Sequence, residues 1–412
     1  MKWNRTQRQF ACFITFTIIN VTINFSWVFR QAEELPGFKL LFDKTEEDLN
    51  ASATASASAS STSAFVSSAE PFKSTMHVNG STNDIPERVL SVLEQLDILS
   101  GGPQASNLEC PPPLIPFQNV IKQSTNNATI AAKESDLKIP RILHVSMKSR
   151  CVPQDIARIL ERWKSKLPNY SIIFHDDDAV EKLISEEWPE FPTLHKAMRC
   201  VLFKGAMKID IWRVLILYKY GGVYTDIDVW PKDAMHESVI RNDLSAYFFT
   251  DVSNRPSQWF MSTEPRHPMM QLYMLEILHN VLKLNNIQKP KLIHVTGPAA
   301  VFNAYKRFLS MNWELSTHNI SVQNNIEVEG PYGKVVMKDR KGFKYVGMKW
   351  DFGDIVPYNG TNVTRGERIR LESGVQHWHK RRKFDLHPNA KSCLGYIRAV
   401  DEGWLNTAAQ SS

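Results

Sequence analysis

Two aspartates, Asp226 and Asp228, stand two positions apart in a segment whose other residues are apolar or β-branched. Because side chains alternate between the two faces of an extended strand, both carboxylates are expected on the same face. Convergent carboxylates supply the hard oxygen ligands that Mg²⁺ or Mn²⁺ prefers. A lone Asp-x-Asp triplet is more often a solvated turn or a helix start, so its meaning depends on the neighbouring segments. We predict a divalent-metal site here.

A helix is predicted just upstream, ending at Gly221-Gly222 as a glycine cap ends a helix. At about 100° per residue, Lys204 and Lys219 fall together on the solvent side, whereas Asp210 and Arg213 fall on the opposite, buried side. Burying two ionisable groups is costly unless they pair or meet a ligand. They could form a structural ion pair one turn apart. The order of helix, double glycine, strand and Asp-x-Asp favours a ligand site.

Strands and helices alternate in the segments that must position these groups. The apolar run Ile139–Val145 predicts a first buried strand, residues 154–167 a helix, and Tyr170–Phe174 a second strand. In the acidic run that follows, we favour Asp178 as the cap of the next helix. This alternation predicts an α/β domain with a parallel sheet, on which ligands bind at the carboxyl ends of strands. The Asp-x-Asp triplet falls at such an end.

Six segments between about residues 139 and 380 carry a resemblance to a known family. They are IPRILH from Ile139, SIIFHDDDAV from Ser171, KGAMKIDIWRVLILYKYGGVYTDIDVW from Lys204, WFMSTEPRHP from Trp259, Thr296-Gly297-Pro298 and Gln376-His377-Trp378. With these segments the chain resembles the DxD-containing retaining glycosyltransferases, a family that includes yeast initiating α-1,6-mannosyltransferases and inositol-phosphoceramide mannosyltransferases. Clostridial glucosylating toxins are more distant members.

The resemblance implies a GT-A fold, a nucleoside-diphosphate sugar as donor, Mn²⁺ or Mg²⁺, and transfer with retention of anomeric configuration. By this resemblance Asp228 would ligate the metal, and Asp226 would reach the donor ribose or sugar and assist the metal. Asp210 and Arg213 would hold the hydroxyls of the transferred sugar. The chain departs from the family where Val145-Ser146-Met147 follows the first strand, because members often carry a tryptophan there that stacks on the donor base.

The late Gln-His-Trp segment also departs from the family pattern, in which a Ser-Trp pair follows the histidine. Here Trp378 directly follows His377. We predict that His377 contacts the diphosphate or the metal and that Trp378 belongs to the substrate site. The alternative is that His377 is a core or surface histidine.

These features favour a metal-dependent retaining glycosyltransferase that moves a hexose, with mannose as the first guess, to a glycan, glycoprotein or glycolipid. A metal cation would neutralise the charge that develops on the departing diphosphate. One alternative is a non-catalytic sugar-binding or scaffold subunit of a Golgi glycosyltransferase complex. A membrane-anchored metal-dependent phosphotransferase is a third, but the sequence has no glycine loop to cradle phosphates.

The N-terminal region predicts membrane attachment. Residues 10–29 are uncharged and about long enough to cross a bilayer, and the positive charges of the short tail 1–9 would keep that tail cytosolic. A cleaved signal peptide is the alternative. We therefore expect a single-pass type II Golgi membrane protein with a lumenal catalytic domain. Asn-x-Ser/Thr sequons downstream of the span agree with a lumenal body.

The remaining domain limits follow from composition. Residues 30–137 read as a stem that includes a Ser/Ala-rich tract and an amphipathic helix at 84–100, which would pack on the main domain or pair with a second copy in a homo-oligomer. The GT-A domain is expected at 138–385 and a tail at 386–412. Four cysteines, Cys110, Cys151, Cys200 and Cys393, could form two disulfides in any of three pairings. The net charge of +6 is too modest to indicate nucleic acid.

Overall fold

The structure is a computed structural model, and all of its described residues belong to one compact unit, residues 86–412. The described residues are 91–100, 108–121, 137–201, 205–233, 235–250, 255–287, 291–313, 326–338, 348–349, 355–374 and 386–402. The predicted span at 10–29 and the Ser/Ala-rich tract lie outside them. No helix within the described ranges is long and apolar enough to cross a membrane.

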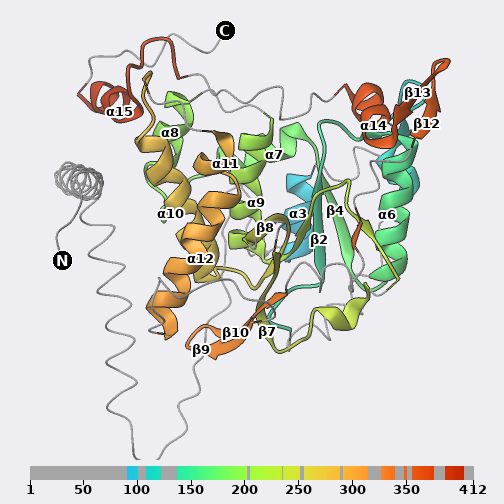
Figure 1. Cartoon of the computed structure of the whole chain (residues 1–412), viewed down its shortest axis with the longest axis horizontal. Helices are drawn as coiled ribbons and strands as arrows, with labels where there is room; N and C mark the ends of the chain where they lie inside the picture. Colours follow the sequence, from blue (N-terminus) through green and yellow to red (C-terminus); the bar gives the residue numbers. More distant parts are fainter. Residues whose placement is uncertain are drawn as a thin grey trace, which may run out of the picture. The chain divides into compact units, whose positions relative to one another are not determined.

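A seven-stranded sheet forms the centre of this unit (Figure 1). Its strand order is β4-β2-β5-β8-β7-β10-β9. The bounds are β2 Ile142–Ser146, β4 Ser171–His175, β5 Gly222–Thr225, β7 Leu244–Thr250, β8 Pro256–Thr263, β9 Ile326–Gly330 and β10 Gly333–Lys338. Short two-stranded pairs join β1 (Ile115–Pro116) to β3 (Cys151–Val152), β6 (Trp230–Pro231) to β11 (Met348–Lys349), and β12 (Ile355–Tyr358) to β13 (Thr361–Thr364).

The sheet is mixed, so the expected α/β class holds but an all-parallel sheet was the wrong prediction. Strands β4, β2 and β5 are parallel, whereas β8 is antiparallel to both β5 and β7. The reason lies in the connection between β7 and β8. The first strand ends at Thr250 and the second begins at Pro256, and so short a gap cannot hold the crossover that parallel neighbours require.

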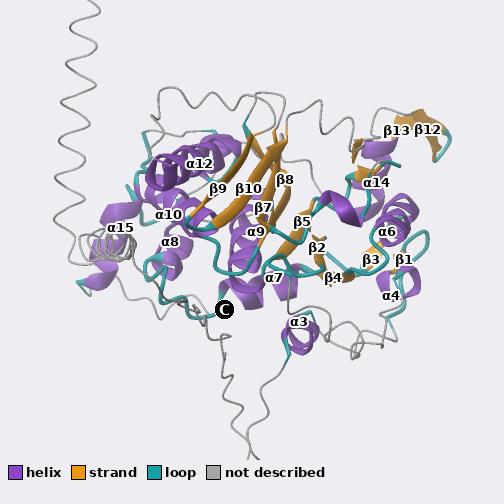
Figure 2. Ribbon diagram, turned by 90° about the horizontal axis from the view of Figure 1, so that it is seen from below, coloured by secondary structure: helices purple, strands orange, loops and turns teal. Residues whose placement is uncertain are grey.

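Helices cover both faces of the sheet (Figure 2). The helices are α3 Val92–Leu99, α4 Phe117–Val120, α6 Gln154–Lys166, α7 Asp177–Ile184, α8 Leu194–Cys200, α9 Ala206–Tyr220, α10 Pro268–Leu282, α11 Leu292–Val295, α12 Pro298–Trp313, α14 Arg365–Ser373 and α15 Cys393–Asp401, with a 3₁₀ turn at Glu237–Val239. One core cluster packs α7, α9, α10 and α12 on one face, and a second packs α4 and α6 on the other.

Strand residues divide between these two clusters by the pleat of the sheet. In β7, Ala246 and Phe248 join the first cluster and Tyr247 and Phe249 join the second. Because both faces are covered, strand β7 is buried at every position. The same alternation runs through the other central strands, so the sheet is a rigid platform for the groups that follow the end of β5.

Packing extends beyond the limits 138 and 385 that composition indicated for the catalytic body. In α3, Leu96 and Leu99 are buried in the first core cluster, and Ser91 and Glu94 form a capping box at its start. Toward the other end, α15 packs on α8 and α10. The described part of the predicted amphipathic helix, α3, therefore packs on the main domain.

Two disulfides tie these flanking parts to the sheet and its helices. Cys110 bonds to Cys151 in β3, and Cys393 at the start of α15 bonds to Cys200 at the end of α8. Of the three pairings that the sequence allows, the structure selects this one. The second bond closes a loop of 193 residues, so it links the C-terminal helix to the centre of the body.

The cap of α7 differs from the prediction. Asp176, the residue after β4, accepts a hydrogen bond from Ala179 N (2.9 Å) and also pairs with Arg150 (2.8 Å). Asp178 lies in the first helical turn instead. Strand β4 extends through His175, so the residue that directly follows takes the extended conformation of an N-cap.

Candidate active site

Helix α9 and strand β5 are joined by two glycines, which allow the chain to turn from the helix into the sheet. Gly221 has a φ of 65° and Gly222 a φ of 94°, conformations that favour glycine. A Cβ on Gly221 would lie 2.7 Å from Pro265, and one on Gly222 would lie 2.8 Å from the Ile142 carbonyl oxygen. The predicted glycine cap is confirmed. Because the chain passes this close to its neighbours, β5 can enter the sheet between β2 and β8.

The Asp-x-Asp triplet forms a turn, and the prediction that it lies in a strand was wrong. Strand β5 ends at Thr225, and Val229 N donates to Asp226 O at 3.0 Å, which closes a turn over the triplet. Asp226 N still donates to Trp259 O at 2.9 Å, so the first aspartate stays fixed to β8. Asp228 therefore lies in the turn that follows the carboxyl end of β5.

Helix α9 is buried more completely than expected. Asp210 and Arg213 are buried, 4% and 6% exposed, as their helical positions predicted. The expected solvent side is narrow, since Lys219 is itself half-buried and pairs with Glu186. The other lysine expected there, Lys204, lies outside the described residues. The ion pair of Asp210 and Arg213 therefore lies on a helix that the hydrophobic core surrounds.

Arg213 joins helix α9 to the turn that contains Asp226 and Asp228. Its Nη2 lies 3.2 Å from Asp210 Oδ1, and its Nη1 lies 3.3 Å from Asp226 Oδ1. Nη1 also donates to the carbonyl oxygen of Gln258 at 2.7 Å. The planar guanidinium thus fixes two carboxylates from different elements at once, which a lysine could not do.

Tyr224 completes this arrangement from β5. Its hydroxyl donates to Asp226 Oδ1 at 2.6 Å, and its ring lies under the Arg213 guanidinium, 4.6 Å from the ring centre to Cζ. Burial raises the pKa of the Tyr224 hydroxyl well above its ordinary value, so it is a donor at neutral pH. Sequence reasoning missed Tyr224, although its place two residues before Asp226 was a usable signal.

Burial also changes the acidity of Asp210. Its pKa rises to about 6 because burial disfavours the carboxylate, against the attraction of Arg213 and a hydrogen bond from Thr296 that favour it. Asp226 is the more accessible carboxylate, with 34% of its side chain exposed. The cluster of Asp210, Arg213, Tyr224 and Asp226 thus presents one partly open carboxylate that buried groups hold in place.

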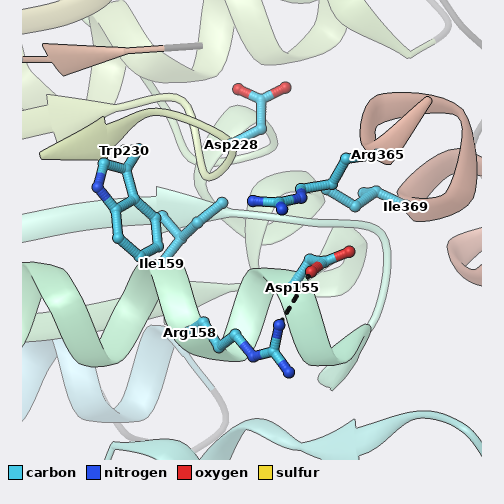
Figure 3. Close-up of a pocket in the computed structure, with 7 residues that line it drawn as sticks. All are labelled: Asp155, Arg158, Ile159, Asp228, Trp230, Arg365 and Ile369. Carbon is cyan, nitrogen blue, oxygen red and sulfur yellow. Dashed lines mark ion pairs between the residues drawn. The ribbon is translucent and has the colours of Figure 1, made fainter. Parts of the chain in front are cut away.

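Asp228 lines a pocket of about 160 Å³ (Figure 3). The other lining residues come from α6, β6 and α14, and they are Asp155, Arg158, Ile159, Trp230, Arg365 and Ile369. Arg365 extends from α14 into this pocket, and Arg158 pairs with Asp155 at 3.7 Å. None of these six was predicted, since α14 reaches the site from far along the chain.

The position of α14 depends on a buried ion pair. Asp155, 3% exposed, accepts from Arg368 Nε at 3.0 Å, and a second nitrogen of the same guanidinium also contacts it. The pair joins residues 213 positions apart. It fastens α14 to the first turn of α6, and both helices contribute residues to the lining of the pocket.

Asp228 has the character of a cation ligand. Its Oδ1 is buried and has no hydrogen-bond partner in the described part of the chain. Burial, followed by the repulsion of Asp226, raises the pKa of Asp228 to about 7. A carboxylate oxygen with no partner beside a second carboxylate fits a hard divalent cation, which would relieve both costs. Asp226 and Asp228 are the residues that would hold it.

The other expected ligands cannot be placed. His377 and Trp378 lie outside the described residues, so their roles stay predictions. Within the described ranges no group of three or more His, Cys, Asp or Glu side chains could hold a metal ion. A divalent cation held by the two carboxylates would take its other ligands from groups such as water or the oxygens of a diphosphate.

Residues 153–246 match the family described as "Glycosyltransferase sugar-binding region containing DXD motif". This segment of the chain is therefore similar to the DXD sugar-binding regions of glycosyltransferases. It contains Asp210, Arg213, Asp226 and Asp228, together with all of α9 and β5. The resemblance inferred from the sequence is confirmed, and the mixed α/β sheet fits a GT-A-like domain.

Several curated relatives of the chain come from yeasts. Inositol phosphoceramide mannosyltransferase 1 of Schizosaccharomyces pombe is 26% identical over 42% of this chain and 53% of its own length. The initiation-specific alpha-1,6-mannosyltransferase of Candida albicans is 33% identical over 24% of this chain and 26% of its own. The chain thus spans about half the length of these relatives or less. Among solved structures, PaToxG Glycosyltransferase aligns with a TM-score of 0.33 and 14% identity over 47% of this chain and 78% of that chain, too weak a likeness to carry an argument.

Proposed function

We propose that the protein is a metal-dependent retaining glycosyltransferase, which transfers a hexose from a nucleoside-diphosphate sugar to a glycan, glycoprotein or glycolipid. One observation carries the proposal. Arg213 bridges Asp210 and Asp226 beside the end of β5. Two residues further along the same turn lies Asp228, whose buried Oδ1 has no hydrogen-bond partner among the described residues. This combination supports the proposal, because an ion pair suited to sugar hydroxyls and a carboxylate suited to a divalent cation lie within the same matched DXD region.

The metal is proposed to bind Asp226 and Asp228, as Mn²⁺ or Mg²⁺. When bound, it would neutralise the negative charge that develops on the diphosphate leaving group. The protein's own part is to keep Asp226 in place through Arg213 Nη1 and the Tyr224 hydroxyl, 3.3 and 2.6 Å away. Since these contacts exist before any ligand arrives, little reorganisation is needed during the reaction.

The sugar is proposed to bind where Asp210 and Arg213 meet the open side of Asp226. A carboxylate that accepts and a guanidinium that donates can together recognise neighbouring hydroxyls of a hexose. With retention, the acceptor hydroxyl attacks the face that the diphosphate leaves, so no separate catalytic base is assigned. The departing diphosphate would take up the proton of that hydroxyl.

Mannose is the first candidate for the transferred sugar, and the names of the relatives support it. One relative is named for mannosyl transfer to inositol phosphoceramide and another for an initiating α-1,6-mannosyl transfer. A sphingolipid and a protein-linked glycan are therefore the two acceptor classes to test. We further propose a type II Golgi membrane location with the site in the lumen, from the uncharged segment 10–29 and the basic residues before it.

Donor hydrolysis tests the proposal most directly. The full chain is incubated with a panel of UDP- and GDP-sugars, with and without Mn²⁺, beside Asp228→Asn. Hydrolysis of one donor only with metal, abolished in the variant, supports the enzyme and identifies the sugar. If the folded wild-type protein hydrolyses none of the donors, the proposal fails and a binding or scaffold role takes its place.

A further inference from the structure

The Thr296-Gly297-Pro298 segment lies against the sugar-binding ion pair. Thr296 caps the short helix α11, and Pro298 begins α12. The Thr296 side chain is fully buried, and its hydroxyl donates to Asp210 Oδ2 at 2.7 Å. Asp210 comes from α9, 86 residues earlier in the sequence. The segment therefore reaches the site through one buried side chain.

A closed ring of hydrogen bonds includes this contact. Asp210 Oδ1 lies 3.2 Å from Arg213 Nη2, and Arg213 Nη1 donates to the Gln258 carbonyl oxygen at 2.7 Å. The side-chain amide of Gln258 then donates to the Thr296 carbonyl oxygen at 2.8 Å. The Tyr273 hydroxyl donates to that same oxygen at 2.8 Å. Both the hydroxyl and the carbonyl of Thr296 are thus fixed, from α9, β8 and α10.

Gly297 explains how Thr296 can come this close. A Cβ at Gly297 would lie 2.5 Å from the Ile293 Cα, a separation that real side chains do not adopt. Only glycine lets the chain leave α11 against its own backbone and enter α12 at Pro298. The three residues of the segment therefore have separable tasks: contact with Asp210, close passage, and the start of the next helix.

We propose that Thr296 is a positioning residue, whose hydroxyl fixes the Asp210 carboxylate in the orientation that receives the transferred sugar. The inference rests on the proposed function, in which Asp210 and Arg213 hold the sugar hydroxyls. The terminal torsion of an aspartate is soft, so a single partner leaves the carboxylate free to rotate. Arg213 and the Gln258 side chain also contact this carboxylate, and Thr296 is the partner that fixes Oδ2. Partners on both oxygens remove that freedom before the ligand binds.

A merely structural role for Thr296 is the competing explanation, and the choice of variants separates the two. Thr296→Val removes the hydroxyl and keeps the shape, whereas Thr296→Ser keeps the hydroxyl. Thr263→Val is the matched control, because Thr263 is also fully buried but its hydroxyl has no hydrogen-bond partner in the described structure. All variants are made in the full chain and assayed on the folded, monodisperse fraction.

The measurements are kcat and KM for the hydrolysed donor, and Kd for that donor and for its free nucleoside diphosphate, all with Mn²⁺. We expect Thr296→Val to lower kcat/KM by about 10- to 100-fold and to weaken binding of the intact donor. Binding of the free nucleoside diphosphate should stay within about twofold of wild type. Thr296→Ser should restore most of the activity, and Thr263→Val should match wild type.

Two results would overturn the inference while leaving the proposed function intact. One is wild-type kcat/KM in the folded fraction of Thr296→Val, whatever its melting temperature. The other is equal weakening of donor and free nucleoside diphosphate, which would mean general distortion of the site. If the wild-type protein hydrolyses no donor, the proposed function fails and this inference fails with it.

Discussion

The Arg213 guanidinium lies 3.3 Å from the Asp226 carboxylate, although the two residues belong to a buried helix and to the turn after a strand. The same guanidinium contacts Asp210, the Gln258 carbonyl oxygen and the face of Tyr224. Arg213 therefore couples the part of the site that would recognise the sugar to the part that would hold the metal.

Arg213→Lys should disable the site while keeping its charge. A lysine offers one ammonium and cannot hold two carboxylates and a carbonyl in a plane. We expect kcat/KM for the donor to fall by at least about 100-fold, which corresponds to about 2.7 kcal/mol of transition-state stabilisation. Steady-state kinetics check this. Arg241→Lys, in an exposed ion pair with Glu327 away from the site, is the control and should retain activity.

Asp228→Asn should separate activity from stability. Loss of one metal carboxylate should slow the reaction by about a thousandfold. The folded protein should be as stable as wild type or more so without metal, because burial already disfavours the charge on Asp228 and raises its pKa to about 7. Donor turnover with Mn²⁺ tests the first part, and thermal unfolding in EDTA and in Mn²⁺ tests the second. A variant that melts well below wild type in EDTA would contradict this account.

Local sequence patterns predicted the acidic-basic pair of α9, because helical periodicity and a glycine cap can both be recognised from residues that are close together in the sequence. They failed for the Asp-x-Asp triplet, because the end of β5 is decided by its pairing with β8 and by the turn hydrogen bond of Val229. The contacts of Thr296 and Arg368 were beyond reach for a different reason. Each joins residues 86 or 213 positions apart, and no local period encodes such a pairing.

His267→Asn should make the protein less sensitive to acid. Burial lowers the pKa of His267 from an ordinary 6.5 to about 3. The folded state therefore takes up this proton at a lower pH than the unfolded state does. The contribution of the neutral His267 ring to the free energy of unfolding is therefore fully present above pH 6.5 and is lost as the pH falls toward 3. His267 caps α10 by accepting from Met269 N, a bond that asparagine can replace.

The expected size of this effect follows from linkage. At pH 5 the wild type should have lost about 2 kcal/mol through this one group, and the variant none. Urea unfolding at pH 7.5 and at pH 5 measures the difference in unfolding free energy between the two proteins. Relative to wild type, the variant should be more stable at pH 5 than at pH 7.5. An unchanged difference would mean that the pKa of His267 is the same in the folded and unfolded states.

A chain that begins at Lys138 should be less stable than one that begins at Pro86. The shorter chain loses Leu96 and Leu99 from the core and leaves Cys151 without its partner Cys110. Lost apolar burial and a lost disulfide together should lower the melting temperature by about 5 °C or more. Cys110→Ser combined with Cys151→Ser in the longer chain isolates the share of the disulfide. Equal melting temperatures for the two chains would show that the α3 packing and the bond to Cys151 contribute nothing to the stability of the body.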